Sequence, residues 1–568
     1  MDYYTANAEK LYHQYQSLKA ERVHATWLKH LPTMPGIACD IGAGSGRDAN
    51  WLAALGWEVI AVEPSEKLLT LGKEASAGKV TWLDDKLPDL GRLRTIGHRF
   101  NLILLSAVWM HLPPVLRQRA FRILSDILMP GGLIVITLRH GSDENENLSR
   151  QFYPVNAEEL QHFAKQRALV CIQHDSQQDQ LGRNKGPENV KWETLVFQLP
   201  DDGTGNLPLL RHIIVNDDKS ATYKLGLLRA LIRIADGAPG MVLARTDDSV
   251  ELPFGLVALY WLKLYMPLVL QHRLIQAPSH KPEQMKGLGF AKQAHFYQLA
   301  KLSTFDLRIG STLSPENASL VVGSIRDACV NIQRMPAHHT TYPGSQKSVF
   351  ECSARSVRFG KGHWQINKES LSKFGTFTVP AKLWQTLGQY ACWLEPAILN
   401  EWTRLMMSYD IRYVRSVYDK ALEWEEGRRD TSVVRNRAEN LLNAGNALRC
   451  VWTDTRLGSH LYQIDHCFPW SRWFNNDLWN LMPASSTANS QKGEKLPSAS
   501  LMHEARPRIL SWWEEAFVDS ELRERFYLEA EAALPLLENN IGGLVPIFEA
   551  VLHQRAKIKM NQQLVEWK

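Results

Sequence analysis

The sequence predicts a multidomain protein with an α/β domain, a mostly helical middle region and a C-terminal α+β region. The chain has 568 residues, several times the length of an ordinary domain. Strand-like and helix-like segments alternate through residues 1–200, and long stretches with helical apolar periodicity fill residues 207–440. Short strands, turns and helices follow, so we expect three domains at residues 1–200, 207–440 and 441–568.

The N-terminal region alternates apolar runs with amphipathic segments. The expected strands are Ile37–Ile41, Glu58–Glu63, Val80–Leu83, Asn101–Leu105 and Leu133–Leu138, and the expected helices between them include Asn50–Leu55 and Ser65–Ala75. This alternation predicts a parallel, doubly wound sheet. Residues 201–206 (DDGTGN) have the composition of a linker and mark the first boundary.

The middle region is predicted to be mostly helical. Helices are expected at Tyr223–Ile234 and Leu383–Met407, with strand-like pieces at Val349–Cys352 and Phe374–Val379. The longest apolar run, Leu252–Leu270, contains a lysine and two prolines. These residues favour a buried helix hairpin over a membrane span.

Composition and charge restrict the class of protein. Apolar residues make up 45% of the chain and charged residues 22%, which is typical of a folded soluble protein. Residues 1–200 carry equal numbers of basic and acidic residues, so the net charge of +5 lies after residue 200, where we would look for a polyanion. Residues 412–437 are dense in both charge signs and form either a solvated helix face or a phosphate-contacting surface.

The cysteines and the N-terminus bear on the cellular compartment. The seven cysteines are scattered and form no CxxC pair, so neither a disulfide framework nor a zinc ribbon is expected. The first residues contain no apolar signal core. We therefore expect a cytoplasmic protein with no membrane partner.

A glycine-rich loop follows the first expected strand. Residues 39–46 (CDIGAGSG) end a strand and open a helix, and Gly42, Gly44 and Gly46 let the backbone turn sharply and approach a ligand. Glu63 lies 17 residues after Gly46 at the end of the next strand, where an acid can accept both hydroxyls of a ribose. These features alone would also suit a dinucleotide.

Later segments narrow the interpretation. Asp84 and Asp85 end the third strand, residues 104–112 (LLSAVWMHL) end the fourth, and residues 128–133 (LMPGGL) turn into the fifth. With these motifs, about 200 residues resemble the class I S-adenosylmethionine-dependent methyltransferases, which implies a Rossmann-like sheet. The resemblance implies cofactor contacts from Asp40, Gly42, Gly44 and Gly46 on the methionine side, Glu63 at the ribose, and Asp84 (or Asp85) at the adenine. A Rossmann-like fold without a cofactor is the alternative.

The methyl acceptor leaves fewer signals. The segment after the fourth strand reads Ser106-Ala107-Val108-Trp109, where amino-methylating DNA enzymes have Asp/Asn-Pro-Pro-Tyr, and no Pro-Cys nucleophile suits a cytosine C5 enzyme. The segment looks like the branch that acts on small molecules or peripheral acceptors. His111 is either a base or a packed histidine at a helix start. Transfer from a sulfonium needs mainly positioning, so the catalytic group need not leave a motif.

A second group of chemical residues lies near the C-terminus, in residues 462–471 (YQIDHCFPWS), 477–483 (DLWNLMP) and 488–493 (ANSQKG). A strand carries Asp465 and His466, Asn480 follows 14 residues after the histidine, and Asn489 lies nine residues further on an expected helix. Oxygen ligands from Asp and Asn favour Mg²⁺ or Mn²⁺. A neighbouring imidazole can then deprotonate a water.

Residues 448–496 resemble the HNH (ββα-metal) nucleases, in the variant of restriction-type and RNA-guided CRISPR nucleases. The resemblance implies that His466 is the general base, that Asp465 and Asn489 hold the metal, that Asn480 pins the loop, and that Lys492 faces the phosphate backbone. Cys450 and Cys467 stand alone, so no structural zinc is expected. A degenerate HNH fold and a chance match are the alternatives.

Together these features predict a DNA endonuclease fused to an S-adenosylmethionine-binding methyltransferase domain. Such a pairing suggests a restriction-like or antiphage system of a prokaryote, with phage or other foreign DNA as the partner. One HNH site serves one strand, so double-strand cuts would need a homodimer or sequential nicks. Two alternatives stay open: a methyltransferase acting on RNA or a metabolite with the HNH unit as a binding module, and a cofactor sensor that gates the nuclease.

Overall fold

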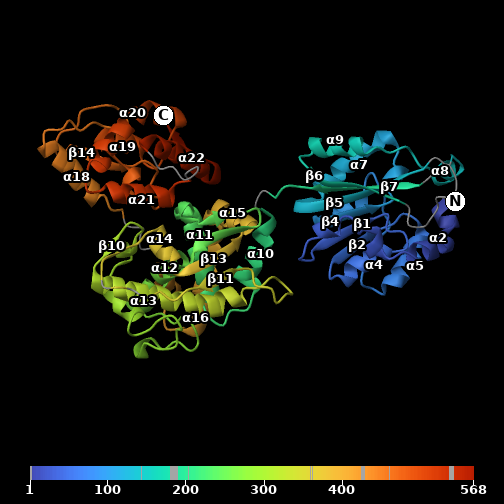
Figure 1. The fold of residues 1–568 in the computed structure, drawn as a ribbon, viewed down its shortest axis with the longest axis horizontal. Helices are drawn as coiled ribbons and strands as arrows, with labels where there is room; N and C mark the ends of the chain where they lie inside the picture. The colour runs from blue at the N-terminus through green and yellow to red at the C-terminus, as the bar shows by residue number, and fades with distance from the viewer. Residues whose placement is uncertain are drawn as a thin grey trace. The chain divides into compact units, whose positions relative to one another are not determined.

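The structure is a computed structural model that forms two compact units, Met1–Gly205 and Asn206–Lys568 (Figure 1). It describes residues 3–141, 144–178, 190–201, 204–357, 360, 362–423, 429–459, 461–535 and 543–568. The division between the units lies within the expected linker, of which residues 202 and 203 lie outside the described residues.

The first unit is built on a seven-stranded sheet with the strand order β3-β2-β1-β4-β5-β7-β6. The strands are β1 (Ile37–Ile41), β2 (Glu58–Val62), β3 (Thr81–Leu83), β4 (Phe100–Ser106), β5 (Leu128–His140), β6 (Val170–Gln178) and β7 (Lys191–Gln198). Strands β1 to β5 are parallel, which confirms the predicted Rossmann-like architecture. The sheet as a whole is mixed, because β7 runs antiparallel to both β5 and β6, and the strands β6 and β7 were not among those expected from the sequence.

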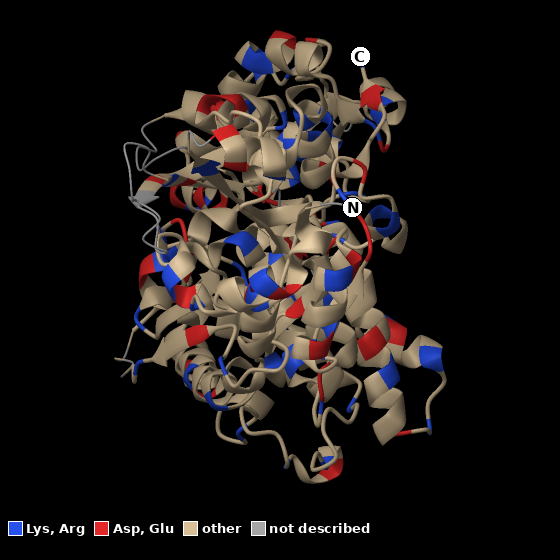
Figure 2. Ribbon diagram, turned by 90° about the vertical axis from the view of Figure 1, so that its right-hand side faces the viewer, with Lys and Arg blue, Asp and Glu red and all other residues tan. Residues whose placement is uncertain are grey.

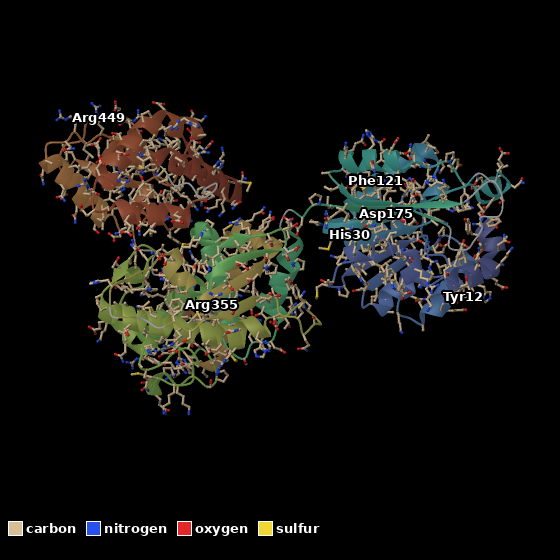
Figure 3. The ribbon with its side chains drawn as sticks, in the orientation of Figure 1. Tyr12, His30, Phe121, Asp175, Arg355 and Arg449 are labelled. Atoms are coloured by element: carbon tan, nitrogen blue, oxygen red, sulfur yellow. The ribbon has the colours of Figure 1, made fainter. Side chains whose placement is uncertain are left out.

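Both faces of this sheet are covered by helices. Along β1 and β4 alternate residues enter different cores, with Cys39 and Ile103 in one and Ala38 and Leu102 in the other. On the first face Phe121 of α7 (Pro114–Asp126) packs against Phe197 of β7 (Figure 3). The other helices of the unit are α1 (Tyr3–Ala6), α2 (Ala8–Gln16), α3 (Ala20–Val23), α4 (Arg47–Ala54), α5 (Glu66–Ser76), α6 (Gly91–Ile96), α8 (Glu144–Arg150) and α9 (Ala157–Gln166). Helix α1 contacts both α5 and α8.

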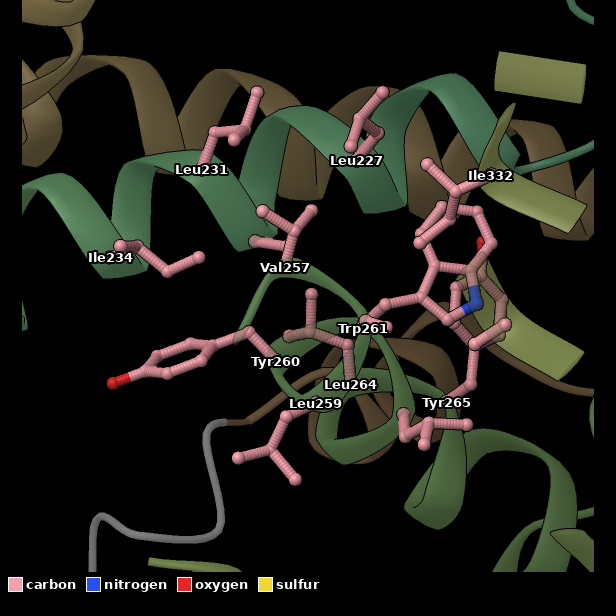
Figure 4. Close-up of a cluster of buried hydrophobic side chains, with 14 of the residues drawn as sticks. Leu227, Leu231, Ile234, Val257, Leu259, Tyr260, Trp261, Leu264, Tyr265 and Ile332 are labelled. Carbon is pink, nitrogen blue, oxygen red and sulfur yellow. The ribbon is translucent and has the colours of Figure 1, made fainter. Parts of the chain in front are cut away.

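The middle region of the chain is built around a mostly apolar helix, α12 (Phe254–Met266), in which Lys263 is the one charged residue. Every residue of α12 is buried. Helix α11 (Tyr223–Gly237) packs along it, with Leu227, Leu231 and Ile234 facing Val257 and its neighbours (Figure 4). A helix with no polar face must be surrounded by protein, and α12 therefore forms the centre of this region.

Helix α12 continues through a π-helical turn, Pro267–Gln271, so the predicted helix hairpin was wrong. Pro253 precedes the first turn, where a missing N–H is tolerated, and the wider π turn accommodates Pro267. The helix Phe254–Gln271 is long and apolar enough to cross a membrane, but 89% of it is buried inside the protein. That burial is typical of a core helix.

The rest of the middle region wraps this centre. A four-stranded sheet has the order β11-β13-β9-β8, formed by β8 (Ala244–Arg245), β9 (Ser249–Pro253), β11 (Glu351–Ala354) and β13 (Gly375–Pro380). The larger helices are α13 (Pro315–Ile332), α15 (Ala381–Gln389), α16 (Ala391–Tyr409) and α17 (Arg415–Ala421). The predicted long helical stretch Leu383–Met407 is thus interrupted at Tyr390.

The C-terminal region has its own hydrophobic core. An antiparallel hairpin of β14 (Tyr462–His466) and β15 (Leu481–Ser485) is followed by α19 (Ser486–Lys492). The surrounding helices are α18 (Ser432–Asn443), α20 (Ala499–Trp513), α21 (Arg523–Ala533) and α22 (Leu544–Gln562). Helix α18 crosses the expected boundary at residue 440, and its buried residues belong to the C-terminal core.

Charges of both signs are interspersed along the ribbon (Figure 2). In the segment 412–437, which is rich in both signs, Arg412 pairs with Asp410, and Arg415 pairs with Asp419. Residues 424–428 of that segment lie outside the described residues. Charge alone therefore does not locate a nucleic-acid surface here.

We predict that the core around α12 dominates the stability of the second unit. Leu231→Ala removes a fully buried side chain and should lower the free energy of unfolding by roughly 2–5 kcal/mol. Hydrogen exchange of peptides from α11 and α12 would measure the change. The matched control is Leu461→Ala, because that side chain is 74% exposed, and its effect should stay within about 0.5 kcal/mol. Equal effects of the two variants would contradict the assignment.

Candidate functional site

The first candidate site begins at the glycine loop after β1. Gly42 and Gly46 both have positive φ angles, of 69° and 75°. A Cβ at Gly42 would lie 2.6 Å from a methyl of Val108, and one at Gly46 would lie 2.9 Å from the ring of Trp82. Both positions therefore require glycine, for backbone conformation and for close packing.

Glu63 fixes the shape of this loop. Its carboxylate is buried and accepts hydrogen bonds from the backbone N–H of Gly44 (2.7 Å) and of Ser65 (2.9 Å). Both carboxylate oxygens are thereby fixed, one against the glycine loop and the other against the segment that follows β2.

Asp40 lies in β1 beneath the loop. Its side chain is buried, and Oδ2 has no hydrogen-bond partner among the described residues. Burial raises the pKa of Asp40 well above its usual range, and the nearby Asp48 adds to this rise. For Asp48 itself, burial alone would raise the pKa, but ion pairs with His24 and Arg47 lower it below its usual range.

A cavity of about 640 Å³ opens beside the loop. Gly42, Gly44 and Glu63 line the part of it that lies over β1 and β2. Asp85 also lines the cavity and accepts a hydrogen bond from the Leu93 N–H (2.9 Å).

Asp84 does not line the cavity. It pairs with Arg92 at 3.3 Å, and both side chains are about two-thirds exposed. The expectation for Asp84 is therefore corrected: of the two candidates, the structure brings Asp85 to the cavity.

The opposite part of the cavity lies over β5 and β7. It is lined by side chains from segments far apart in the chain, namely Tyr4, His111, Arg139, Arg150, Phe152, Trp192 and Thr194. Tyr4 Oη lies 3.1 Å from His111 Nε2, so this phenol and imidazole face the cavity as a pair. Apart from His111, sequence reasoning missed these residues, because no local motif joins them.

The second candidate site lies at the end of the β14–β15 hairpin. Asp465 and His466 end β14 opposite Met482 and Leu481 of β15, and α19 follows directly. Asp465 is buried and accepts hydrogen bonds from Trp452 Nε1 (3.0 Å) and Lys492 Nζ (3.1 Å). Burial raises the pKa of Asp465 above its usual value, although the Lys492 ammonium partly offsets this rise.

Lys492 was expected to face the phosphate backbone, but its side chain is buried. Its ammonium also donates to the carbonyl oxygen of His466 (2.6 Å). Asn489 is half-buried one helical turn earlier, on the same face of α19. Among the described residues, no three His, Cys, Asp or Glu side chains gather to hold a metal. A metal here would rely on the oxygens of Asp465 and Asn489 together with water.

The protonation of His466 follows from its hydrogen bonds. Asn476 Oδ1 accepts from the backbone N–H of Asp430 (3.1 Å) and lies 3.0 Å from His466 Nε2. A backbone N–H can only donate, so the atom that faces it is the amide oxygen, and Nε2 must then carry the hydrogen. Nδ1 keeps its lone pair, and this atom is buried with no hydrogen-bond partner in the described part of the chain.

The imidazole is also held neutral. Burial lowers the pKa of His466 to about 4, with smaller contributions from the charges of Arg429 and Lys492. Arg429 is exposed, and it donates to the carbonyl oxygen of Ile464 (3.3 Å). An imidazole that is neutral at pH 7 can accept a proton.

A braced loop supports these residues. Asn480 is fully buried, accepts from the Phe468 N–H (3.0 Å) and donates to the carbonyl oxygen of Asn475 (3.0 Å). Asp477 accepts from Asn475 Nδ2 (2.7 Å) and from Trp479 Nε1 (3.1 Å). Asn476 lies inside this loop, and no signal in the sequence distinguished it from its neighbours.

The loop should respond to pH through Asp477. Burial, helped by the charge of Glu529, raises the pKa of Asp477 above the value near 4 that is usual for an unfolded carboxyl. In this window the folded state holds a proton that the unfolded state has lost, so stability should fall as pH rises from about 4 toward 7.

Asp477→Asn should abolish this loss, which is on the order of 1 kcal/mol per pKa unit. Hydrogen exchange of peptides covering residues 473–480 at pH 5 and pH 8 would measure it. Asp519→Asn, at an exposed position, is the matched control. The same pH dependence in Asp477→Asn as in the parent protein would refute the assignment.

Comparison with known proteins matches three regions of the chain. Residues 11–175 match a methyltransferase domain, residues 203–422 match a domain of unknown function (DUF8808), and residues 450–498 match an HNH endonuclease. No curated protein matches the chain.

Among solved structures, the chain is similar to three methyltransferases, each over about a third of its length. A putative sarcosine dimethylglycine methyltransferase from Galdieria sulphuraria is 15% identical, with 32% of this chain and 85% of that chain covered at a TM-score of 0.27. N-methyltransferase NodS from Bradyrhizobium japonicum WM9 is 15% identical, with 32% and 87% covered at 0.26. Magnesium protoporphyrin IX methyltransferase from Synechocystis PCC 6803 is 13% identical, with 34% and 83% covered at 0.26.

The family matches confirm both resemblances seen in the sequence. The chain contains a methyltransferase domain in its N-terminal unit and an HNH endonuclease domain near its C-terminus.

Proposed function

We propose that the protein is a metal-dependent DNA endonuclease whose N-terminal domain binds S-adenosylmethionine. The observation that carries the nuclease proposal is His466 Nδ1, which is unprotonated and has no hydrogen-bond partner among the described residues, one residue after the buried carboxylate of Asp465. A general base and a hard oxygen ligand next to each other are what phosphodiester hydrolysis by an HNH site requires.

The residues present fit a divalent cation such as Mg²⁺ or Mn²⁺. Each Asp465 oxygen accepts one hydrogen bond, from Lys492 Nζ or Trp452 Nε1, and keeps a second lone pair for an ion. Asn489 offers an amide oxygen on the same face of α19 as Lys492. Asp465 and Asn489 would hold the ion. When bound, it supplies positive charge to the phosphate undergoing attack.

The chain's own residues provide the remaining chemistry. His466 Nδ1 takes a proton from a water while Asn476 keeps Nε2–H oriented. The water oxygen forms a bond to phosphorus, the phosphorus–oxygen bond to one of the two sugars breaks, and the leaving sugar oxygen takes a proton from solvent. Arg429 is exposed and close enough to lower the pKa of His466, so its guanidinium is available to a phosphate oxygen.

The N-terminal cavity fits an adenosyl cofactor. Backbone groups of the glycine loop and the carboxylates of Glu63 and Asp85 line it, and carboxylates suit the hydroxyl and amine donors of an adenosine. When bound, S-adenosylmethionine supplies a methyl group. The Ser106-Ala107-Val108-Trp109 segment, which lacks the Asp/Asn-Pro-Pro-Tyr of amino-methylating DNA enzymes, favours a small-molecule acceptor over a DNA base.

We also propose that the DNA substrate is foreign, in keeping with the fusion of a nuclease to a methyltransferase domain. A prokaryotic cell uses such a pairing to distinguish phage DNA from its own. A sensor role, in which the cofactor gates the nuclease without methyl transfer, is the second candidate.

The first test is incubation of the full chain with supercoiled plasmid and with phage DNA in Mg²⁺ or Mn²⁺. We expect nicking that a chelator abolishes and that His466→Ala lowers by roughly 10²–10⁴-fold, the usual contribution of a general base. Linear product would indicate two coordinated cuts. Runs with and without S-adenosylmethionine separate a sensor from an independent methyltransferase.

His503→Ala is the matched control, since His503 is exposed on α20, and it should cut at the parent rate. Equal cutting by His466→Ala, or no cutting with either metal and either DNA, would overturn the nuclease assignment.

Asn476 should act as a positioning residue. Asn476→Ala releases Nε2–H, so we expect kcat to fall by about 10- to 100-fold while KM for DNA changes little. Histidine ¹⁵N NMR would show His466 losing its single Nε2–H tautomer. Asn446→Ala, at an exposed position in the same region, should change neither quantity. An Asn476→Ala enzyme with the parent kcat and tautomer would exclude this role.

A further inference from the structure

The part of the N-terminal cavity over β5 and β7 has the chemistry of an anion site. Arg139 and Arg150 both line it. The side chain of Arg139 is only 5% exposed, and its Nε is buried without a hydrogen-bond partner among the described residues. A buried guanidinium with an unused donor is costly unless a ligand satisfies it.

The charges in this part of the cavity do not cancel. Arg139 and Arg150 share one carboxylate, that of Glu146, whose oxygens lie 2.5 Å from Arg139 and 3.4 Å from Arg150. Among the described residues of this group, two guanidinium groups against one carboxylate leave an excess of one positive charge. A ligand carrying a negative charge would balance it.

Aromatic rings hold both guanidinium groups in place. The Arg139 guanidinium carbon lies 5.1 Å from the centre of the Phe152 ring, and that of Arg150 lies 5.2 Å from Tyr3 and 5.8 Å from Phe152. Stacking of this kind fixes the guanidinium plane before a ligand arrives, which lowers the entropy cost of binding.

The strand register places further polar groups beside Arg139. Thr137 and Arg139 of β5 pair with Thr194 and Trp192 of β7, and all four line the cavity. The Tyr4–His111 pair faces the same space. An acceptor held here would therefore have hydroxyl groups, an imidazole and a fixed guanidinium around it.

We propose that this part of the cavity binds a small methyl acceptor that carries a carboxylate or a phosphate, and that Arg139 binds this anionic group. The proposal rests on the proposed methyltransferase function of the domain. In the transfer, a lone pair of the acceptor forms the bond to the methyl carbon, and the carbon–sulfur bond breaks with its electron pair on sulfur. The acceptor's proton leaves to the Tyr4–His111 pair or to water.

The test begins with the cofactor site alone. Calorimetric titration of the full chain with S-adenosylhomocysteine measures cofactor binding and does not depend on the acceptor. Absence of binding would defeat the proposed methyltransferase function itself. Binding by Arg139→Met with the parent Kd would show that the variant is folded and that Arg139 does not serve the cofactor.

The second arm adds anions to the complex with S-adenosylhomocysteine. Inorganic phosphate and acetate are titrated at constant ionic strength, and the rise in melting temperature gives an apparent Kd. We expect at least one anion to bind, with Arg139→Met weakening it by about 10- to 100-fold, as loss of a charge-assisted hydrogen bond predicts. Phosphate alone would indicate a phosphoester acceptor, and acetate alone a carboxylate. Arg139→Lys, which keeps the charge, should retain part of the affinity.

Controls separate the competing explanations. Arg122→Met, at an exposed position on α7, should bind anions like the parent protein. If Arg139→Met weakens S-adenosylhomocysteine but not methylthioadenosine, Arg139 binds the carboxylate of the cofactor and the proposal fails. It also fails if neither anion binds, if Arg139→Met responds like the parent, or if a short RNA binds far more tightly than phosphate through Arg139.

Discussion

A buried carboxylate at the end of a β-strand needs hydrogen-bond donors. This requirement shapes both the N-terminal cavity and the site at the β14–β15 hairpin. An unpaired buried carboxylate costs several kcal/mol. Glu63 meets the cost with two backbone N–H groups, one of them from the glycine loop, so the carboxylate sets the shape of the loop. Asp465 meets it with the indole of Trp452 and the ammonium of Lys492, which ties the segment before the hairpin and the end of α19 to this carboxylate.

The hydrogen-bond network around His466 extends well beyond the 49 residues that match the HNH endonuclease. The oxygen of Asn476 is shared between His466 and the backbone of Asp430, just before α18. The loop that contains Asn476 is held from the other side by α21, where Glu529 accepts from the Leu478 N–H (2.8 Å). Helix α18 buries its apolar face in the same core. Orientation of the base therefore depends on segments before and after the matched residues.

The sequence predicts what depends on local pattern. The parallel strands follow from apolar runs, the glycine loop from spacing, and the Asp465–His466 site from three short segments. Features that depend on contacts between residues far apart in the chain could not be predicted from the sequence. The antiparallel β7 reads like any other strand, and Asp84 and Asp85 differ only in which way the chain turns. Tyr4, Trp192 and Thr194 lie outside residues 11–175, which match the methyltransferase domain, and no local motif marks them in the sequence. Asn476 contacts His466 through a single amide oxygen, and its neighbours Asn475 and Asp477 are polar residues of similar size, so the sequence does not single it out.

The burial of α12 on all sides has a consequence for synthesis. As the chain emerges from the ribosome, α11 is already available to cover one side of α12, but α13 begins only at Pro315 and α16 at Ala391. Until those helices arrive, an apolar segment long enough to cross a membrane is exposed to water and to the membrane-insertion machinery. Yield of the native protein should thus depend on the speed of elongation through residues 272–409 and on chaperones that shield α12 in the meantime.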